Sequence, residues 1–275
     1  MAIELYNDGN HKCIAYEDLV VCDKERDAAA AGSRQVNSCE SVQSNQFLIV
    51  NDGHAAVIDP GGNLTYTRLF MAISDHVVVK NLDYVIASHQ DPDIVASLNK
   101  WLVGTHCKVI VPELWARFVP HFCTPGNTIG RIIGIPDEGM DIQIGNGVIK
   151  ALPAHFLHSE GNFHFYDPVS KILFSGDVGT SAVESEKLAI PVQDFDAHIP
   201  NMIGFHQRYM NSNKVCRLWA NMIRTLDVEA IIPQHGPGFK GKEMVGKFLN
   251  WFEYLECGVD LLDQTHFRVP GLNAA

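Results

Sequence analysis

The chain has 275 residues, of which 46% are hydrophobic, and it carries a formal net charge of −11 at pH 7. This apolar content excludes a disordered protein, and the acidic balance argues against nucleic acid or an anionic membrane as partner, because phosphate binding requires clustered lysine and arginine. No run of about 18 apolar residues is present and the first residues lack a basic stretch followed by an apolar one, so neither a membrane span nor a signal peptide is expected.

The first 45 residues are polar and irregular, apart from two short apolar stretches compatible with a hairpin, Lys12–Tyr16 and Asp18–Cys22. Clearer signals begin at Gln46–Val50 and Ala55–Asp59, two apolar runs joined by a turn that contains Asp-Gly, which is typical of a β-hairpin. Helices and short strands then alternate. They are predicted as a helix at Leu64–His76, a strand at Tyr84–Ser88, a helix at Asp93–Val103 and a strand at Lys108–Val111.

The second half of the chain predicts more strands, followed by helices. The strands are expected at Asp141–Ile144, Gly147–Leu152, Asn162–Tyr166 and Lys171–Ser175. The helices are expected at Pro200–Met210, Lys214–Leu226 and Lys242–Cys257, with a last strand at Ala230–Pro233. This order predicts an α/β fold in which two sheets pack face to face and helices cover the outer faces. No linker or repeat stands out, so we predict one domain over residues 1–275 that includes the irregular first 45.

The first candidate site follows the predicted strand Tyr84–Ser88, where the sequence reads His89-Gln90-Asp91-Pro92-Asp93-Ile94. In a tight loop at a strand end, the first and third residues of this H-x-D-x-D pattern can hold one metal ion while the fifth turns toward a second. Open α/β folds also place their sites at strand ends. The alternative is a solvated loop in which Asp93 is the N-cap of a helix, and this motif alone does not decide between the two.

Three further residues of the metal-binding type stand at strand ends or in loops. They are His158 in Leu157-His158-Ser159, Asp177 in Phe174-Ser175-Gly176-Asp177, and His235 in Ile232-Pro233-Gln234-His235-Gly236-Pro237. Together with the first motif they form a set of three imidazoles and three carboxylates.

This set resembles the metallo-β-lactamase superfamily and, within it, the metal-binding domain of flavodiiron proteins. The acid at Asp91 is typical of that subgroup, because zinc hydrolases usually have histidine there. Leu157-His158 and the stretch 232–237 also look like the flavodiiron pattern, whereas the stretch 174–177 is shared by the whole superfamily. The resemblance covers about Gln46 to Cys257 and implies a metallo-β-lactamase-like αββα sandwich. In Asp59-Pro60-Gly61-Gly62, which recurs in the superfamily, Asp59 is expected to be a buried hydrogen-bonding residue of a turn.

The resemblance also implies a site for two metal ions, with iron expected and zinc or manganese as alternatives. One ion would be bound by His89, Asp91 and His158 and the other by Asp93 and His235, with Asp177 bridging them. Carboxylates bind hard ions, and an oxygen-rich set shifts the preference away from zinc. Metals in such sites lie roughly 3.5–4 Å apart, a distance that a bridging peroxide can span.

Two departures from the family pattern bear on function. Ile94 stands where the superfamily has its last motif histidine, so the second ion is expected to keep an open or water-filled position unless His155, His198 or His206 replaces that ligand. The chain also ends at Ala275, about where flavodiiron proteins begin the flavodoxin-like domain that carries FMN. We therefore expect no FMN in this chain, and a separate donor if the metals are to be reduced rapidly.

The resemblance to stand-alone oxygen-binding diiron proteins linked to bacterial chemotaxis implies a non-haem diiron protein that binds dioxygen, including as a peroxo adduct. We expect an oxygen or iron sensor more than a catalyst. The alternatives are an oxygen or nitric oxide reductase with a separate electron donor, and a zinc-dependent hydrolase.

Dioxygen is the expected ligand, and a chemotaxis signalling protein or an electron donor the expected partner, with a homodimer as a further expectation. The seven cysteines are odd in number and form no C-x-x-C pair, which is typical of reduced thiols, so a cytoplasmic location is expected.

Overall fold

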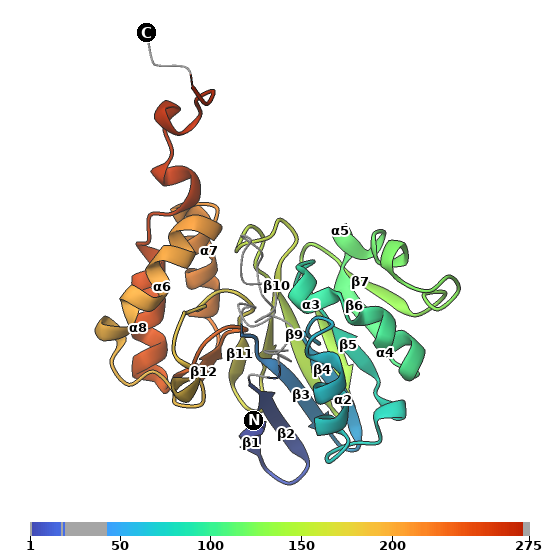
Figure 1. Cartoon of the computed structure of the whole chain (residues 1–275). Coiled ribbons are helices and arrows are strands. Elements are labelled where there is room, and N and C mark those ends of the chain that lie inside the picture. Colours follow the sequence, from blue (N-terminus) through green and yellow to red (C-terminus); the bar gives the residue numbers. More distant parts are fainter. Residues whose placement is uncertain (1, 18, 20–42, 272–275) are drawn as a thin grey trace, which may run out of the picture.

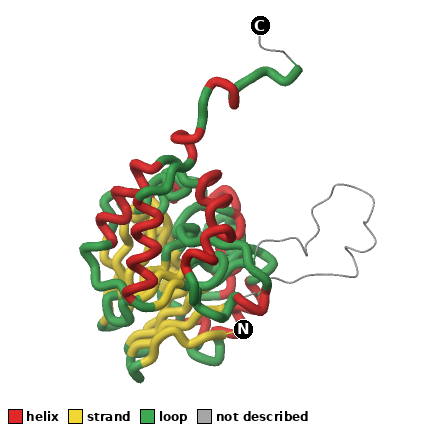
Figure 2. Tube along the Cα trace, turned by 90° about the vertical axis from the view of Figure 1, so that its left-hand side faces the viewer, coloured by secondary structure: helices red, strands yellow, loops and turns green. Residues whose placement is uncertain are grey.

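The computed structural model describes residues 2–17, 19 and 43–271. Two β-sheets lie face to face in the middle of the molecule, and helices cover both outer sides (Figures 1 and 2). The predicted α/β class and the αββα sandwich are confirmed. Most of the second half of the hairpin expected before residue 23 lies outside the described residues.

The first sheet follows the order of the sequence. Its strands are β1 (Ala2–Asn7), β2 (His11–Tyr16), β3 (Gln46–Asn51), β4 (His54–Ile58), β5 (Tyr84–Ile86), β6 (Lys108–Pro112) and β7 (Ile132–Ile135). Pairing is antiparallel from β1 to β4 and parallel from β4 to β7. The predicted hairpin of β3 and β4 is confirmed, whereas β2 forms its hairpin with β1, which precedes it.

The second sheet has the order β13-β12-β11-β10-β9-β8. Its strands are β8 (Met140–Ile144), β9 (Gly147–Pro153), β10 (Phe163–Asp167), β11 (Ile172–Phe174), β12 (Ala230–Ile232) and β13 (Phe239–Lys240). Its neighbouring strands are antiparallel, except that β11 and β12 run parallel. All five strands predicted here are confirmed to within one or two residues at their ends.

Helices α2 (Tyr66–Ile73) and α4 (Leu98–Gly104) lie beside the first sheet, and α6 (Phe195–Tyr209), α7 (Asn213–Ile223) and α8 (Lys242–Glu253) beside the second (Figure 1). The remaining described helices are short. They are α3 (Pro92–Val95), α5 (Glu113–Ala116), η2 (Val79–Asn81), η3 (Val119–Phe122), η4 (Ser185–Lys187), η5 (Gly258–Leu261) and η6 (Gln264–His266). Across the described ranges, no helix combines the length and the apolar character that crossing a membrane requires.

The helix expected at Lys242–Cys257 ends at Glu253, and two other predicted helices differ in their continuity or their start. The helix expected at 93–103 is broken after α3, where the Ser97 hydroxyl donates to the Gly61 carbonyl at 2.5 Å and accepts from Trp101 Nε1 at 3.2 Å. The break therefore ties the start of α4 to the loop that follows β4. The helix expected to begin at Pro200 begins instead at Phe195, because the Asp194 carboxylate accepts from the Ala197 backbone N–H and caps the first turn.

Three buried apolar clusters stabilise these layers. One lies between the two sheets, where the ring of Phe47 on β3 packs against Phe174 on β11 with centroids 4.7 Å apart. The others fill the spaces between each sheet and its helices. Because both sheets are covered on both faces, their short inner strands β5, β11 and β12 are apolar throughout and do not alternate.

A buried carboxylate connects the two sheets. Asp167, at the end of β10, accepts hydrogen bonds from His11 Nε2 at 2.7 Å, from the Cys13 thiol at 3.2 Å and from the Ser170 hydroxyl. His11 and Cys13 belong to β2 of the other sheet. Burial raises the pKa of Asp167, but the hydrogen bonds from His11 and Ser170 outweigh it and hold that pKa below its usual value.

The hydrogen bonds around His11 determine which of its ring nitrogens carries the proton. The Asn51 amide oxygen accepts from the backbone N–H groups of Asn146 and Gly147, each at 3.0 Å, so its NH₂ group must donate to His11 Nδ1 at 2.8 Å. The imidazole proton therefore sits on Nε2, where it is donated to Asp167. Although these side chains lie close enough to hold a metal ion, a neutral imidazole cannot use a protonated nitrogen as a ligand.

Substituting Asp167→Asn should destabilise the fold by about 1–3 kcal/mol, because buried donors lose their anionic acceptor. The folded pKa of Asp167 lies below the unfolded value of about 3.9. The difference in the free energy of unfolding between wild type and D167N should thus have its full size above the unfolded pKa. It should shrink as the pH falls through the folded pKa. Denaturant unfolding of both proteins between neutral and acidic pH measures this. The exposed Asp141→Asn is the matched control, and equal stability of D167N and wild type at neutral pH would contradict the interpretation.

Candidate metal centre

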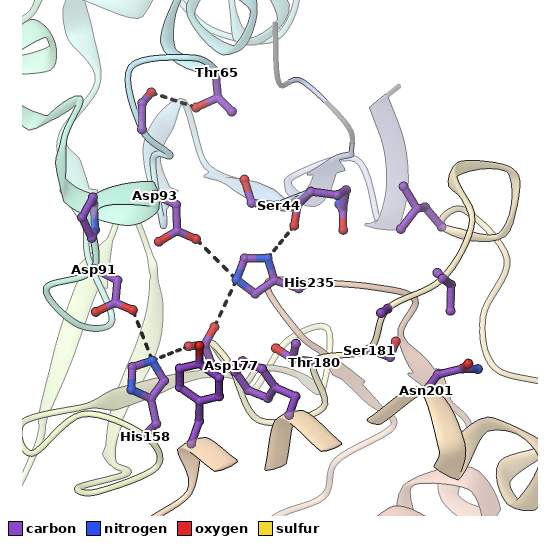
Figure 3. A pocket seen from close by; sticks show the side chains of 18 of the residues that line it. Ser44, Thr65, Asp91, Asp93, His158, Asp177, Thr180, Ser181, Asn201 and His235 are labelled. Atoms are coloured by element: carbon purple, nitrogen blue, oxygen red, sulfur yellow. Dashed lines mark hydrogen bonds and ion pairs between the residues drawn. The ribbon is translucent and has the colours of Figure 1, made fainter. Parts of the chain in front are cut away.

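The ends of four strands bring the six predicted ligands to one edge of the sandwich. His89 follows β5, Asp91 and Asp93 lie at the start of α3, His158 lies in the loop between β9 and β10, and Asp177 and His235 follow β11 and β12. Five of these side chains converge in Figure 3, where dashed lines join Asp177 to His158 and to His235. Residues up to 146 positions apart in the sequence (235 − 89) thus share one site.

One group of four side chains surrounds a common point. Asp177 Oδ2 lies 2.7 Å from His158 Nε2 and 3.4 Å from His89 Nε2. Asp91 Oδ2 lies 3.3 Å from His158 Nε2 and 3.7 Å from His89 Nε2. The four residues each offer one ligand atom, and all of these atoms lie within 4.8 Å of one another.

A second group adjoins the first. His235 Nε2 lies 3.3 Å from Asp177 Oδ1 and 3.4 Å from Asp93 Oδ2. The two oxygens of Asp177 therefore face different groups, Oδ2 toward His89 and His158 and Oδ1 toward His235. This is the arrangement that a carboxylate bridging two cations requires.

Hydrogen bonds from outside the cluster fix two of the imidazole rings. Ser88 Oγ lies 2.9 Å from His89 Nδ1 and 3.1 Å from Asp59 Oδ2, while the other oxygen of Asp59 accepts the Ser88 backbone N–H at 2.8 Å. His235 Nδ1 donates to the Gln43 carbonyl at 2.5 Å. Each contact leaves Nε2 of the ring directed into the cluster, as metal-binding histidines require. The prediction that Asp59 is a buried hydrogen-bonding residue is confirmed.

The charges of the cluster are strongly coupled. Burial lowers the pKa of His89, but the negative charge of Asp177 outweighs it and raises that pKa to about 10. Burial likewise opposes protonation of His158, and its hydrogen bonds to Asp177 and Asp91 raise its pKa to about 9. Burial raises the pKa of Asp177, yet the positive charge of His89 and the hydrogen bond from His158 hold it well below its usual value. The site therefore demands positive charge beside its carboxylates.

The donor set fits metal ions in place of those protons. His89 Nε2 and Asp177 Oδ1 are buried and have no hydrogen-bond partner among the described residues, a state that buried polar atoms rarely tolerate. Three imidazole nitrogens and three carboxylates suit iron, manganese or zinc. Metal binding would displace the protons of the histidine rings, and it would give His89 Nε2 and Asp177 Oδ1 a partner.

None of the three alternative histidines is placed to serve as a seventh ligand. His206 Nε2 accepts from the Gly179 backbone N–H and its Nδ1 donates to the Met202 carbonyl, both at 2.9 Å. His155 Nε2 donates to a backbone carbonyl in the turn before β8. His198 packs edge-on against Phe239 in the helical layer, 5.9 Å between centroids. Ile94 itself is fully buried in the core between the first sheet and its helices.

Sequence reasoning missed several residues that support the site. Ser88 and Gln43 orient the two rings described above, Gln234 Nε2 approaches Asp93 Oδ2 at 3.4 Å, and the ring of Tyr209 lies edge-on to His158, 5.5 Å between centroids. Ser88 could have been found, because it is the one polar residue before the motif histidine in an apolar strand. A backbone carbonyl such as that of Gln43 leaves no signal in a sequence.

A wide cavity of about 1080 Å³ opens over the cluster (Figure 3). Its floor contains Asp91, Asp93, His158, Asp177 and His235. Its walls are mainly apolar and include Leu64, Leu188, Phe205 and Tyr209.

Replacing Asp177 with alanine should abolish the binding of two metal ions, because both groups lose their shared oxygen ligand. Reconstitution with ferrous iron, followed by metal analysis, should give at most one ion per chain. Asp196→Ala, an exposed residue of α6, is the matched control and should load as the wild type does. Full two-metal occupancy of folded D177A would exclude a bridging role.

A family model described as "ODP family beta lactamase" matches residues 42–236 of the chain. Among curated proteins, an uncharacterized protein of Methanocaldococcus jannaschii is 27% identical over 216 residues, which are 75% of this chain and 52% of that protein. The chain thus spans about half the length of this relative.

Solved structures extend the comparison. The structure titled "Peroxy diiron species of chemotaxis sensor ODP" is 37% identical, with a TM-score of 0.80 and coverage of 96% of this chain and 99% of that one. The apo state of the chemotaxis sensor ODP from T. denticola has the same identity and coverage and a TM-score of 0.78. The flavodiiron protein from Giardia intestinalis, at 15% identity and a TM-score of 0.71, covers 91% of this chain and 58% of that one, and shares the fold.

Proposed function

Because the chain belongs to the ODP beta-lactamase family, we propose that it is a non-haem protein that binds dioxygen at a centre of two iron ions and acts as an oxygen sensor. One observation carries the proposal: the two oxygens of Asp177 face two separate groups of ligand-type atoms. The solved relative that shares 37% of its residues is itself described as a diiron chemotaxis sensor.

In this proposal the two ions have unequal surroundings. His89, Asp91 and His158 hold one ion, Asp93 and His235 hold the other, and Asp177 gives one oxygen to each. The second ion has fewer protein ligands, because the residue after Asp93 is an isoleucine packed into the core. Coordination positions therefore remain for a small exogenous ligand on the side of the wide cavity.

Bound ferrous iron would supply the electrons that make dioxygen binding favourable. The protein supplies three carboxylates, which favour higher metal charge, and rings held rigidly by Ser88 and the Gln43 carbonyl. Phe205 and Tyr209 line the cavity beside the cluster, and the ring of Tyr209 lies edge-on to His158. We propose that the oxygen-bound state is communicated to a signalling protein, in keeping with the sensor role of the solved relative.

Metal analysis with visible spectroscopy tests the proposal. Protein reduced under anaerobic conditions should contain about two irons per chain and should develop a visible charge-transfer band when air is admitted. Colourless protein that holds zinc after aerobic purification would contradict the proposal. Steady oxygen consumption with an added electron donor would identify a reductase instead, and hydrolysis of thioesters by the zinc-loaded protein would identify a hydrolase.

Substituting Ile94→His should change the oxygen response, because it restores the last motif histidine that the superfamily has at this position. We expect unchanged iron content with altered oxygen affinity, measured by titrating the reduced protein with dioxygen. Val103→His, on the exposed side of α4, is the matched control and should behave as the wild type does. If folded I94H responds to oxygen as the wild type does, the missing ligand has no functional role.

A further inference from the structure

A second, smaller cavity of about 250 Å³ is lined in part by His89, which does not line the wide cavity. The residues that line it come from the motif loop, from β6 and from the segment that includes α5 and η3. They are His89, Gln90, Val95, Val111, Pro112, Trp115, Phe118, Val119 and Phe122. Val111 and Val119 are buried, whereas Phe118 and Phe122 are each 43% exposed and flank the opening to solvent. The cavity thus leads from the surface to a residue of the metal centre.

The lining contains few polar side-chain atoms. His89 Nδ1 contacts Ser88 Oγ, and its Nε2 faces the carboxylates of the metal centre. The carbonyl oxygen of the Gln90 side chain accepts from the Ser159 hydroxyl at 2.5 Å. Trp115 Nε1 is buried without a hydrogen-bond partner among the described residues, and a β-carbon on Gly161 would lie 3.2 Å from it. The NH₂ group of Gln90 and the N–H of Trp115 therefore remain among these side-chain groups, and both are donors.

A water molecule in such a cavity would lack acceptors for its protons among the lining side chains. Buried water is retained where it makes two to four hydrogen bonds, and cavities lined by apolar side chains stay dry and take up apolar molecules such as xenon. Two donors without an acceptor leave both protons of such a water without a partner among the lining side chains. The cavity therefore favours a small, apolar, uncharged molecule over water.

We propose that this cavity is a docking site for dioxygen beside the metal centre. The inference rests on the proposed function, because it concerns the access of the same ligand to the same site. The occupant follows from the place and chemistry of the cavity: dioxygen is small and apolar, and His89 is shared by the cavity and the metal centre. The wide cavity is lined by three carboxylates and two imidazoles of the metal centre, which give water many more partners than the smaller cavity does.

Xenon binding to the metal-free protein tests the docking site independently of iron. Xenon should occupy the cavity in pressurised crystals, and in solution it should shift the methyl resonances of Val95, Val111 and Val119. Val119→Phe, which fills the cavity, and Phe118→Trp, which narrows its opening at an exposed position, should each reduce xenon binding. Val103→Phe adds the same ring at an exposed position and is the matched control.

Stopped-flow mixing of the ferrous protein with dioxygen tests the role of the site. V119F and F118W should slow oxygen association severalfold, with unchanged iron content and unchanged final spectrum, whereas V103F should not. The absence of xenon from the wild-type cavity, or association at the wild-type rate in a variant that excludes xenon, would overturn the inference. If xenon binds but the ferrous protein never reacts with dioxygen, the proposed function fails while the apolar-gas site stands.

Discussion

The structure around the metal centre depends on one buried carboxylate. Asp177 is 3% exposed, and its oxygens face imidazoles from three separate segments. A buried charge without compensation is costly, so the neighbouring strand ends must bring positive charge to this point. Gly176 makes the turn that presents Asp177, because its φ of +48° lies in the left-handed region that favours glycine. The end of β11 lies beside Ser88 at the end of β5, the residue that orients His89.

Much of this arrangement could be predicted from the sequence, because its main signals are local. Apolar runs ending in His89, Asp177 and His235 identified both the strands and the residues that the strands present. The resemblance to a known fold then grouped them. Strands with weaker patterns were missed: β1 alternates between exposed and partly buried residues, and β13 has only two residues.

Other features depend on contacts between distant segments and were beyond sequence reasoning. The helix after the first motif looked continuous, and it is broken by a hydrogen bond from Ser97 to a carbonyl 36 positions earlier. The orientation of His235 depends on the backbone of Gln43, 192 positions away. Such bonds use groups that every residue carries, so no residue type marks them in advance.

The described chain has two clusters of metal-binding residue types, and their residue types alone do not determine whether a ring nitrogen is free to bind metal. At the metal centre, contacts to Nδ1 leave Nε2 of each oriented ring available, whereas at His11 the donor amide of Asn51 forces the proton onto Nε2. The difference lies in one atom of one side chain: an aspartate in place of Asn51 would accept where the asparagine donates. The direction of a single hydrogen bond thus decides whether the His11 ring offers an unprotonated Nε2, and a designer who wished to add a second, thiolate-containing centre would begin with Asn51 and not with the ligands.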